Sequence, residues 1–468
     1  MLRRCAVLGI AALALCPRAR AADPDWRALD DETVSVLTRY VRLDTTNPPG
    51  NERIAADFFK KLFERDGITS QIYESAPGRA SIVARLRGDG SKPPIVLMHH
   101  MDVVHADKRF WKHDPFSGEI RDGAVWGRGA IDVKGMGVTN AMALLALKRA
   151  NARLASDVIF LGVADEEAGG ALGAGFMVDQ HLSVFDGAGV VLNEGGYIAT
   201  DNAGEVRFYA VETAQKVPLW LRLTATGSSG HGSLPRPDSA PSRLVAALSR
   251  IEAWATPLHV TPELQRFYAD TAHLETGARR ERLRDLRKAL QDPAFAAEFT
   301  ANPRQNAQVR NTISLTVLAS GAKTNVIPPE ARAELDVRLL PDQDPKQFVA
   351  EITQVIADDK IRIETLLSFP PASSPIEHEL FDVLREIAAR DHPGAVVASP
   401  LAIGFTDCHY FREKGIPCYG FLPFALSDRD GALVHGNDER ISLANLKSGT
   451  RLTFELVSRL AGARLPAR

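Results

Sequence analysis

The chain has 468 residues, of which 45% are hydrophobic, and this is enough for two domains with sizeable cores. Its 56 lysines and arginines nearly balance 58 aspartates and glutamates, so no basic excess points to a nucleic-acid partner. The only long apolar run lies at the N-terminus, and we therefore predict no integral membrane span.

Residues 1–22 have the pattern of a signal peptide. Two arginines precede the apolar segment Cys5–Cys16, which is too short to span a membrane, and Ala19-Arg20-Ala21 fits the small-x-small cleavage rule. A lipid anchor at Cys16 fits less well. We therefore predict an exported protein, periplasmic or secreted. Export would permit a disulfide between Cys408 and Cys418, although two buried free thiols fit the sequence equally.

Helices and strands alternate through residues 23–212. The predicted helices are Asp30–Tyr40, Asn51–Gly67 and Val138–Ala150, and the predicted strands are Ser81–Leu86, Ile95–Met98, Val158–Val163 and Val190–Leu192. This alternation is typical of an α/β fold with a mainly parallel sheet flanked by helices. The pattern resumes after Pro370-Pro371, with helices at Ile376–Arg390 and Ser442–Leu460 around a strand at Ile416–Phe421. Residues 23–212 and 371–468 are therefore predicted to form one discontinuous domain.

Residues 213–370 have a different pattern. Apolar residues alternate in several predicted strands, and the order of elements is β-α-β-β-α-β, which is the order of a ferredoxin-like domain. The elements are Pro218–Thr226, Ser239–Trp254, Thr312–Ala319, Ala333–Leu339, Pro345–Ala357 and Ile361–Leu367. An extra helical insert is predicted at about 257–304. We therefore predict an inserted α+β domain.

Acidic and histidine side chains follow three strands of the first domain. The buried strand Val158–Val163 leads directly into Asp165, Glu166 and Glu167, whose mutual repulsion and loss of water a cation would relieve. Two adjacent glutamates can also divide the work, because one can bind a metal while the other handles protons. Neighbouring strands lead to His100 and Glu194, and ligands bind at this edge of open α/β sheets.

The candidate metal ligands are His100, Asp132, Glu167, Glu194 and His435. Imidazole and carboxylate together suit Zn2+, with Mn2+ or Co2+ as substitutes. Asp102 could orient the imidazole of His100, and Asp132 could bridge two ions. Each residue alone has an ordinary explanation, such as a core histidine, a helix cap at Asp132 or a turn at His435. Their convergence on one sheet edge favours a metal site.

The order of the motifs resembles one known family. The motifs are His100-Met101-Asp102-Val103-Val104, Gly129–Gly135, Asp165-Glu166-Glu167, Asn193-Glu194-Gly195-Gly196, Ser229-Gly230-His231-Gly232-Ser233, Asn325-Val326-Ile327-Pro328 and His435-Gly436. They resemble the co-catalytic zinc metallopeptidases that include carboxypeptidase G, aminoacylase, acetylornithine deacetylase, succinyl-diaminopimelate desuccinylase and yeast carboxypeptidase S. The resemblance spans nearly the whole mature chain.

This resemblance implies a role for each matching residue. Asp132 would bridge two zinc ions, with His100 and Glu194 completing one site and Glu167 and His435 completing the other. Glu166 would be the general base, and Asp102 would orient His100. The inserted domain would be a lid through which two chains form a homodimer. His231 on this lid would reach the active site of the partner subunit and stabilise the oxyanion.

The resemblance also implies substrate contacts at Asn325, Arg338 and Gly404. The sequence departs from the family at His409, where many members carry an arginine that grips the substrate carboxylate. A histidine is a weaker and pH-dependent anion ligand, and Arg412 is a candidate to compensate.

We therefore predict an exported hydrolase with two zinc ions that cleaves small peptides, as a carboxypeptidase or dipeptidase, with a metal-activated water. An N-acyl-amino-acid amidohydrolase of the aminoacylase or deacetylase type is the alternative. A protein that only binds metal or a ligand is the non-enzymatic alternative, and Glu166 speaks against it because no metal site requires it as a ligand.

Overall fold

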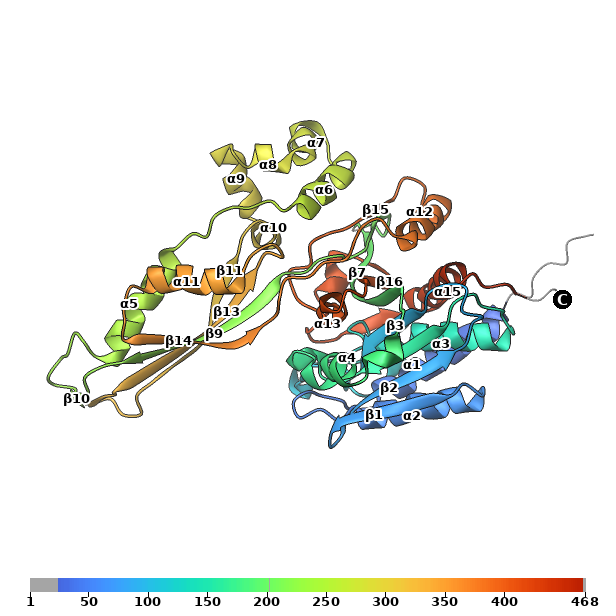
Figure 1. Cartoon of the computed structure of the whole chain (residues 1–468), viewed down its shortest axis with the longest axis horizontal. Helices are drawn as coiled ribbons and strands as arrows, with labels where there is room; N and C mark the ends of the chain where they lie inside the picture. The colour runs from blue at the N-terminus through green and yellow to red at the C-terminus, as the bar shows by residue number, and fades with distance from the viewer. Residues whose placement is uncertain (1–23, 202, 466–468) are drawn as a thin grey trace, which may run out of the picture.

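The computed structural model describes residues 24–201 and 203–465, so the predicted signal peptide lies outside the described residues. Figure 1 shows an α/β unit on the right, an elongated α+β unit on the left, and a group of short helices above them. No helix within the described ranges is both long and apolar enough to cross a membrane.

The first unit is built on an eight-stranded mixed sheet. Its strand order is β1-β2-β6-β3-β7-β8-β15, and β16 pairs with β7. The central strands β6, β3 and β7 are mutually parallel, so their carboxyl ends lie at one edge of the sheet. The strands are β1 (Ser70–Ala76), β2 (Arg79–Leu86), β3 (Ile95–His100), β6 (Val158–Val163), β7 (Val190–Thr200), β8 (Val206–Ala210), β15 (Val396–Ala398) and β16 (Cys418–Leu426).

Helices cover both faces of this sheet. Helix α3 (Lys134–Arg149) contacts α1 (Trp26–Val41), α15 (Leu443–Leu460) and strand β3, and all of its residues from Lys134 to Leu147 are buried. A helix that is apolar on every side belongs in the interior, which explains its weak amphipathic pattern. Other helices of this unit are α2 (Arg53–Arg65), α4 (Phe176–Gln180), α12 (Glu379–Asp391), α13 (Cys408–Glu413) and α14 (Asp428–Gly431).

The second unit is an antiparallel sheet in the order β11-β13-β9-β14, with two helices on one face. Leu219, Leu221 and Leu223 alternate along β9 and are buried under these helices, as the period of a strand requires. The elements are β9 (Val217–Thr226), α5 (Ala240–Ala253), β11 (Thr312–Ser320), β13 (Glu330–Leu339), α11 (Pro345–Ile356) and β14 (Ile361–Ser368). The predicted fold class, a mainly parallel α/β sheet with a ferredoxin-like insertion, is confirmed.

The outer edge of the second sheet is apolar and exposed. Among the residues that the structure describes, β11 pairs with β13 alone, and Leu315, Val317 and Leu318 are 38%, 43% and 59% exposed. An unpaired edge with an apolar surface is a ready template for pairing with another chain.

The short helices above the two units form a group that we call the helical insert. It comprises α6 (Pro262–Thr271), α7 (Gly277–Arg284), α8 (Leu286–Ala289), α9 (Pro293–Thr300) and α10 (Pro303–Gln308). Tyr268, Phe295 and Phe299 are the centre of a small core of its own, which Leu401 of the first unit also joins. Thr261, Asp292 and Asn302 cap α6, α9 and α10, and Pro follows each of them in the first turn, which stabilises short helices that propensity alone would not hold.

Candidate metal centre

Neighbouring parallel strands bring the predicted ligands together. His100 is the last residue of β3, and Glu166 and Glu167 lie in the short 3-10 helix that follows β6. Glu194 was expected just after a strand ending at Leu192, but β7 continues to Thr200 and carries Glu194 inside it. Asp132 lies in the loop before α3, and His435 lies in the loop after α14.

The two oxygens of Asp132 face two different histidines. Its Oδ1 lies 3.1 Å from Nε2 of His100, and its Oδ2 lies 3.1 Å from Nε2 of His435. On the first side, Glu194 Oε1 lies 3.4 Å from His100 Nε2, and on the second, Glu167 Oε2 lies 3.2 Å from His435 Nε2. The structure therefore brings together all five predicted ligands, in two sets that share one carboxylate.

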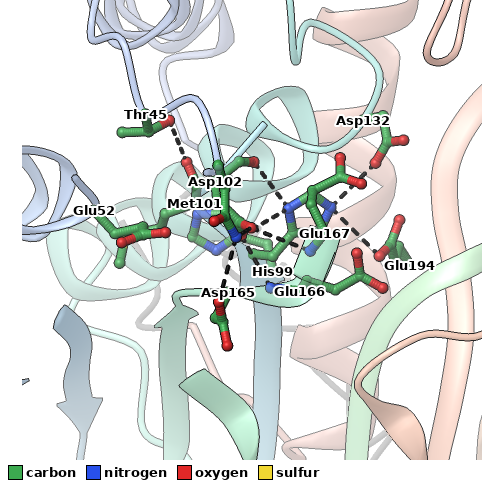
Figure 2. A network of polar contacts seen from close by, with 12 residues as sticks. Thr45, Glu52, His99, Met101, Asp102, Asp132, Asp165, Glu166, Glu167 and Glu194 are labelled. Carbon is green, nitrogen blue, oxygen red and sulfur yellow. Dashed lines mark hydrogen bonds and ion pairs between the residues drawn. The ribbon is translucent and has the colours of Figure 1, made fainter. Parts of the chain in front are cut away.

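Figure 2 shows Asp132, Glu167 and Glu194 around one imidazole. His100, Asp132 and Glu167 each offer one possible ligand atom, and these three atoms lie within 4.8 Å of one another. The same holds for His100, Glu166 and Glu194. His100 is 1% exposed, whereas His435 is 53% exposed, so the second set faces the solvent. Two imidazoles and three carboxylates, largely buried, are a donor set that suits zinc.

The pKa values show how much negative charge gathers here. Burial, which is the largest cause, raises the pKa of Glu166 and of Glu194 well above the usual range. Neighbouring carboxylates act in the same direction, while the charge of His100 acts against them. Hydrogen bonds to Asp132 and Glu167 raise the pKa of His435 to about 10. Burial acts to raise the pKa of Asp132, but hydrogen bonds from His100 and His435 lower it below the usual range. Such a cluster needs positive charge, which a bound divalent cation supplies while the carboxylates stay ionised.

Asp102 connects His100 to the segment that carries Glu166. Its Oδ1 and Oδ2 accept hydrogen bonds from the backbone N–H groups of Glu166 and Glu167, at 3.2 and 3.1 Å. Nδ1 of His100 lies 3.0 Å from the carbonyl oxygen of Asp102 and 3.5 Å from its Oδ1. The side chain of Asn47 donates to Asp102 Oδ2 at 2.8 Å. Asp102 therefore fixes the imidazole and both glutamates together.

The residue before the two glutamates is held in an unusual conformation. Asp165 has a φ of 74°, and its Oδ1 accepts a hydrogen bond from Arg79 at 2.8 Å. Arg79 also donates to both carboxylate oxygens of Glu52, which is fully buried. A left-handed aspartate is uncommon and persists where its surroundings determine it. Figure 2 shows Glu52 and Asp165 on the side of the site away from Asp132.

Sequence reasoning missed Glu439, which holds the loop of Asp132. Its carboxylate accepts backbone hydrogen bonds from Gly129, Ile131 and Asp132 at 2.8 to 3.1 Å, and a hydrogen bond from Arg128 at 2.8 Å. Burial raises the pKa of Glu439, while these four donors favour its charged form. Arg128 donates in turn to the carbonyl of Gly436 at 2.9 Å. The only sequence signal is an acid four residues after His435.

His231 lies away from this cluster in the same chain. It belongs to β10 (Gly230–His231), which pairs with β12 (Val326–Ile327), and Figure 1 shows β10 at the end of the second unit farthest from the first. The N–H of Gly232 donates to the carbonyl oxygen of Asn325 at 2.9 Å, so Asn325 lies beside His231. A role for either residue at the metal centre therefore requires a second chain or a large closure.

The other predicted substrate contacts lie where the two units meet. Arg338 is paired with Asp336 at 2.7 Å and lies over the ring of Phe405, next to the exposed Gly404. His409 is buried, with its Nδ1 2.9 Å from Glu413 Oε1 and its ring stacked 3.7 Å from that of Phe369.

Arg412 does not compensate for the missing arginine. Both of its terminal nitrogens lie 3.0 Å from the carboxylate oxygens of Glu212, and the pair is buried. A buried guanidinium that forms a bidentate pair is not available to a substrate. Next to it, Cys408 and Cys418 form a disulfide, which settles the alternative left open by the sequence.

Comparisons with known proteins agree with this architecture. N-fatty-acyl-amino acid synthase/hydrolase PM20D1 of Xenopus tropicalis is 30% identical over 444 residues, covering 91% of this chain and 85% of that protein. Aminoacylase-1 of Sus scrofa is 27% identical over 442 residues, covering 92% of this chain and 95% of that protein.

Among solved structures, an M20 family metallo-carboxypeptidase from Sulfolobus solfataricus has the same fold. The TM-score is 0.68 at 19% sequence identity, and the match covers 92% of this chain and 99% of the other. The model of peptidase family M20/M25/M40 matches residues 96–459, which include the whole cluster described above. The chain therefore belongs to peptidase family M20/M25/M40, and it is a metallohydrolase of peptide or amide bonds with a dinuclear metal site.

Proposed function

We propose that this protein hydrolyses the amide bond of N-acyl amino acids with two zinc ions. The observation that carries the metal assignment is Asp132, whose two oxygens each face a different histidine, and each of these histidines also lies beside one glutamate. In this proposal His100 and Glu194 hold one zinc ion, Glu167 and His435 hold the other, and Asp132 bridges them. Mn2+ or Co2+ could substitute, because the same donors accept them.

The bound zinc ions would polarise the amide carbonyl and lower the pKa of a water molecule between them. Glu166 lies beside this position without being needed as a ligand, and its backbone is fixed by Asp102. Its carboxylate accepts the proton of the attacking water and delivers this proton to the nitrogen of the leaving amine. Asp102 keeps the imidazole of His100 oriented, because its backbone oxygen lies against Nδ1.

The choice of N-acyl amino acids rests on whole-chain similarity. PM20D1 and aminoacylase-1, which are matched over more than 80% of both chains, act on N-acyl amino acids by their names. A carboxypeptidase activity on small peptides is the second candidate, because the fold also matches the metallo-carboxypeptidase from Sulfolobus solfataricus. Both substrates carry an amide next to a free carboxylate, so the metal centre alone does not distinguish them.

We further propose that two chains form a homodimer through the exposed edge strand β11 and that His231 acts on the partner's metal centre. Its position at the far end of the second unit supports an action in trans, where the imidazole would stabilise the oxyanion. Asn325 would contact substrate from the same tip, and Arg338, Gly404 and His409 would contact it from the junction of the two units. The segment 1–22 and the disulfide support export to an oxidising compartment.

The test is a panel of substrates read by mass spectrometry. The purified protein is incubated with N-acyl amino acids and with unblocked dipeptides, before and after removal of metal with a chelator, and again after adding Zn2+. Zinc-dependent release of amino acid from the N-acyl substrates is the expected result. Cleavage of dipeptides alone would transfer the assignment to the second candidate, and activity that survives full removal of metal would overturn both.

A further inference from the structure

A cavity of about 460 Å3 lies between the first unit and the helical insert. Its inner wall is formed by the second half of β7 and by β8, including Gly195 and Phe208. Its outer wall is formed by the insert, with Phe267 of α6 and Leu274 directly after it. The insert contributes none of the five clustered ligands, but it forms the wall of this cavity opposite β7.

One wall of the cavity continues the segment that carries a metal ligand. Gly195 and Gly196 line it, and they directly follow the ligand Glu194. Ala402, two residues before Gly404, lines it as well, and so does Leu426, the last residue of β16, which pairs with β7. Two segments that carry predicted site residues therefore form one side of the cavity, and a substrate whose amide lies at the metal centre has this space within reach.

One part of the lining suits an uncharged, apolar group. The rings of Phe208 and Phe267 meet edge to face at 5.8 Å, and Leu274, Leu283, Leu401 and Leu426 add aliphatic surface. The buried Glu212 at its inner end is neutralised by Arg412, and Arg279 is paired with Glu298 at 3.1 Å. Arg304 and Asp428, which also line it, are exposed to solvent. Arg207 and Glu275 line the cavity too, so the apolar surface covers one part of it. Pockets for small molecules typically combine such an apolar surface with some polar groups.

We propose that this cavity binds the acyl chain of the substrate, so that the helical insert sets the acyl chain length that the enzyme prefers. The proposal rests on the proposed function and adds its substrate class, namely N-acyl amino acids with medium or long apolar acyl chains. At about 30 Å3 for a water-sized group, the cavity holds about fifteen such groups, which is far more than an acetyl group fills. An apolar chain gains up to about fourfold in binding for each methylene buried.

The test compares hydrolysis of N-acetyl, N-octanoyl and N-hexadecanoyl derivatives of one amino acid. We expect the wild type to have a higher kcat/KM for the octanoyl than for the acetyl substrate. Leu274→Trp narrows the cavity, and it should lower the octanoyl-to-acetyl ratio of kcat/KM by about tenfold while acetyl hydrolysis stays unchanged. Phe267→Ala opens the cavity and should shift the preference toward the longer chain.

Leu182→Trp is the matched control. Leu274 and Leu182 both lie in short 3-10 helices, and Leu182 is 37% exposed on another part of the surface. Its chain-length profile should equal that of the wild type. Acetyl hydrolysis by the wild type with unchanged ratios in both cavity variants would overturn the acyl pocket and leave the proposed function standing. No hydrolysis of any N-acyl substrate by the zinc-loaded wild type would overturn the proposed function itself.

Discussion

Replacing Glu439 with glutamine should weaken a metal centre that this residue does not touch. The carboxylate is fully buried and receives four hydrogen bonds, three of them from the backbone around Asp132. Glutamine has nearly the same shape, but it loses the negative charge and one of the two acceptor oxygens. The N–H groups that orient Asp132 would then compete for the remaining oxygen, and Arg128 would lose its ionic partner.

The expected losses of folding free energy and of zinc affinity follow from these contacts. Breaking a buried ion pair by removing one partner costs about 3 to 5 kcal/mol of folding free energy. Here the low end, about 3 kcal/mol, applies because Arg128 keeps its hydrogen bond to the Gly436 carbonyl and its position over the ring of Trp111. Loss of a residue that orients a ligand lowers metal affinity by about 10- to 100-fold, so zinc affinity should fall within that range.

Urea unfolding of the metal-free protein and zinc competition with a chelator measure the two effects separately. Glu455→Gln is the control, because it removes a surface partner of Arg390 that is 31% exposed, and it should cost less than about 1 kcal/mol with unchanged zinc affinity. The reasoning is refuted if Glu439→Gln matches this control in both measurements.

Three further changes test other parts of the structure. Glu166→Gln should retain both metal ions, as measured by metal analysis, yet lower kcat by about 10²- to 10⁴-fold, and near-normal turnover would contradict its role as base. A mixture of inactive His231→Ala and Glu166→Ala subunits should recover about one quarter of wild-type activity, since half of the randomly paired dimers carry one intact site; no recovery after subunit exchange would contradict an action in trans. Replacing Cys408 and Cys418 with serine opens a loop closed over a sequence separation of 10, and should lower the free energy of unfolding by about 3 kcal/mol in a denaturant titration; an unchanged midpoint would show that the disulfide does not stabilise the fold.

Local patterns in the sequence predicted the main sheets. Alternating leucines in β9 and the buried run of β6 have the periods that their surroundings require, so both strands were located to within one residue. Short strands of three residues, such as β4 (Glu119–Arg121) and β5 (Ala124–Trp126), were missed because too few residues are present to show a period. β8 was also missed, since only its last two residues are buried.

Local sequence patterns likewise predicted some residues of the metal centre and missed others. Residues at strand ends, such as His100 and Glu167, could be predicted because the edge of a parallel sheet gathers them. Glu439 and Arg79 act through partners that are hundreds or tens of residues away in the chain, and no local spacing indicates such pairs. The proposed compensation by Arg412 was wrong for the same reason, because its partner Glu212 lies 200 residues away.

The helical insert has a core that is separate from the sheet carrying the metal ligands. Residues such as Phe295 and Phe299 therefore pack mainly against one another, and substitutions among them should leave the geometry around Asp132 unchanged. If the insert binds the acyl chain as we propose, its replacement should change the range of accepted substrates while the residues around the metal centre stay the same.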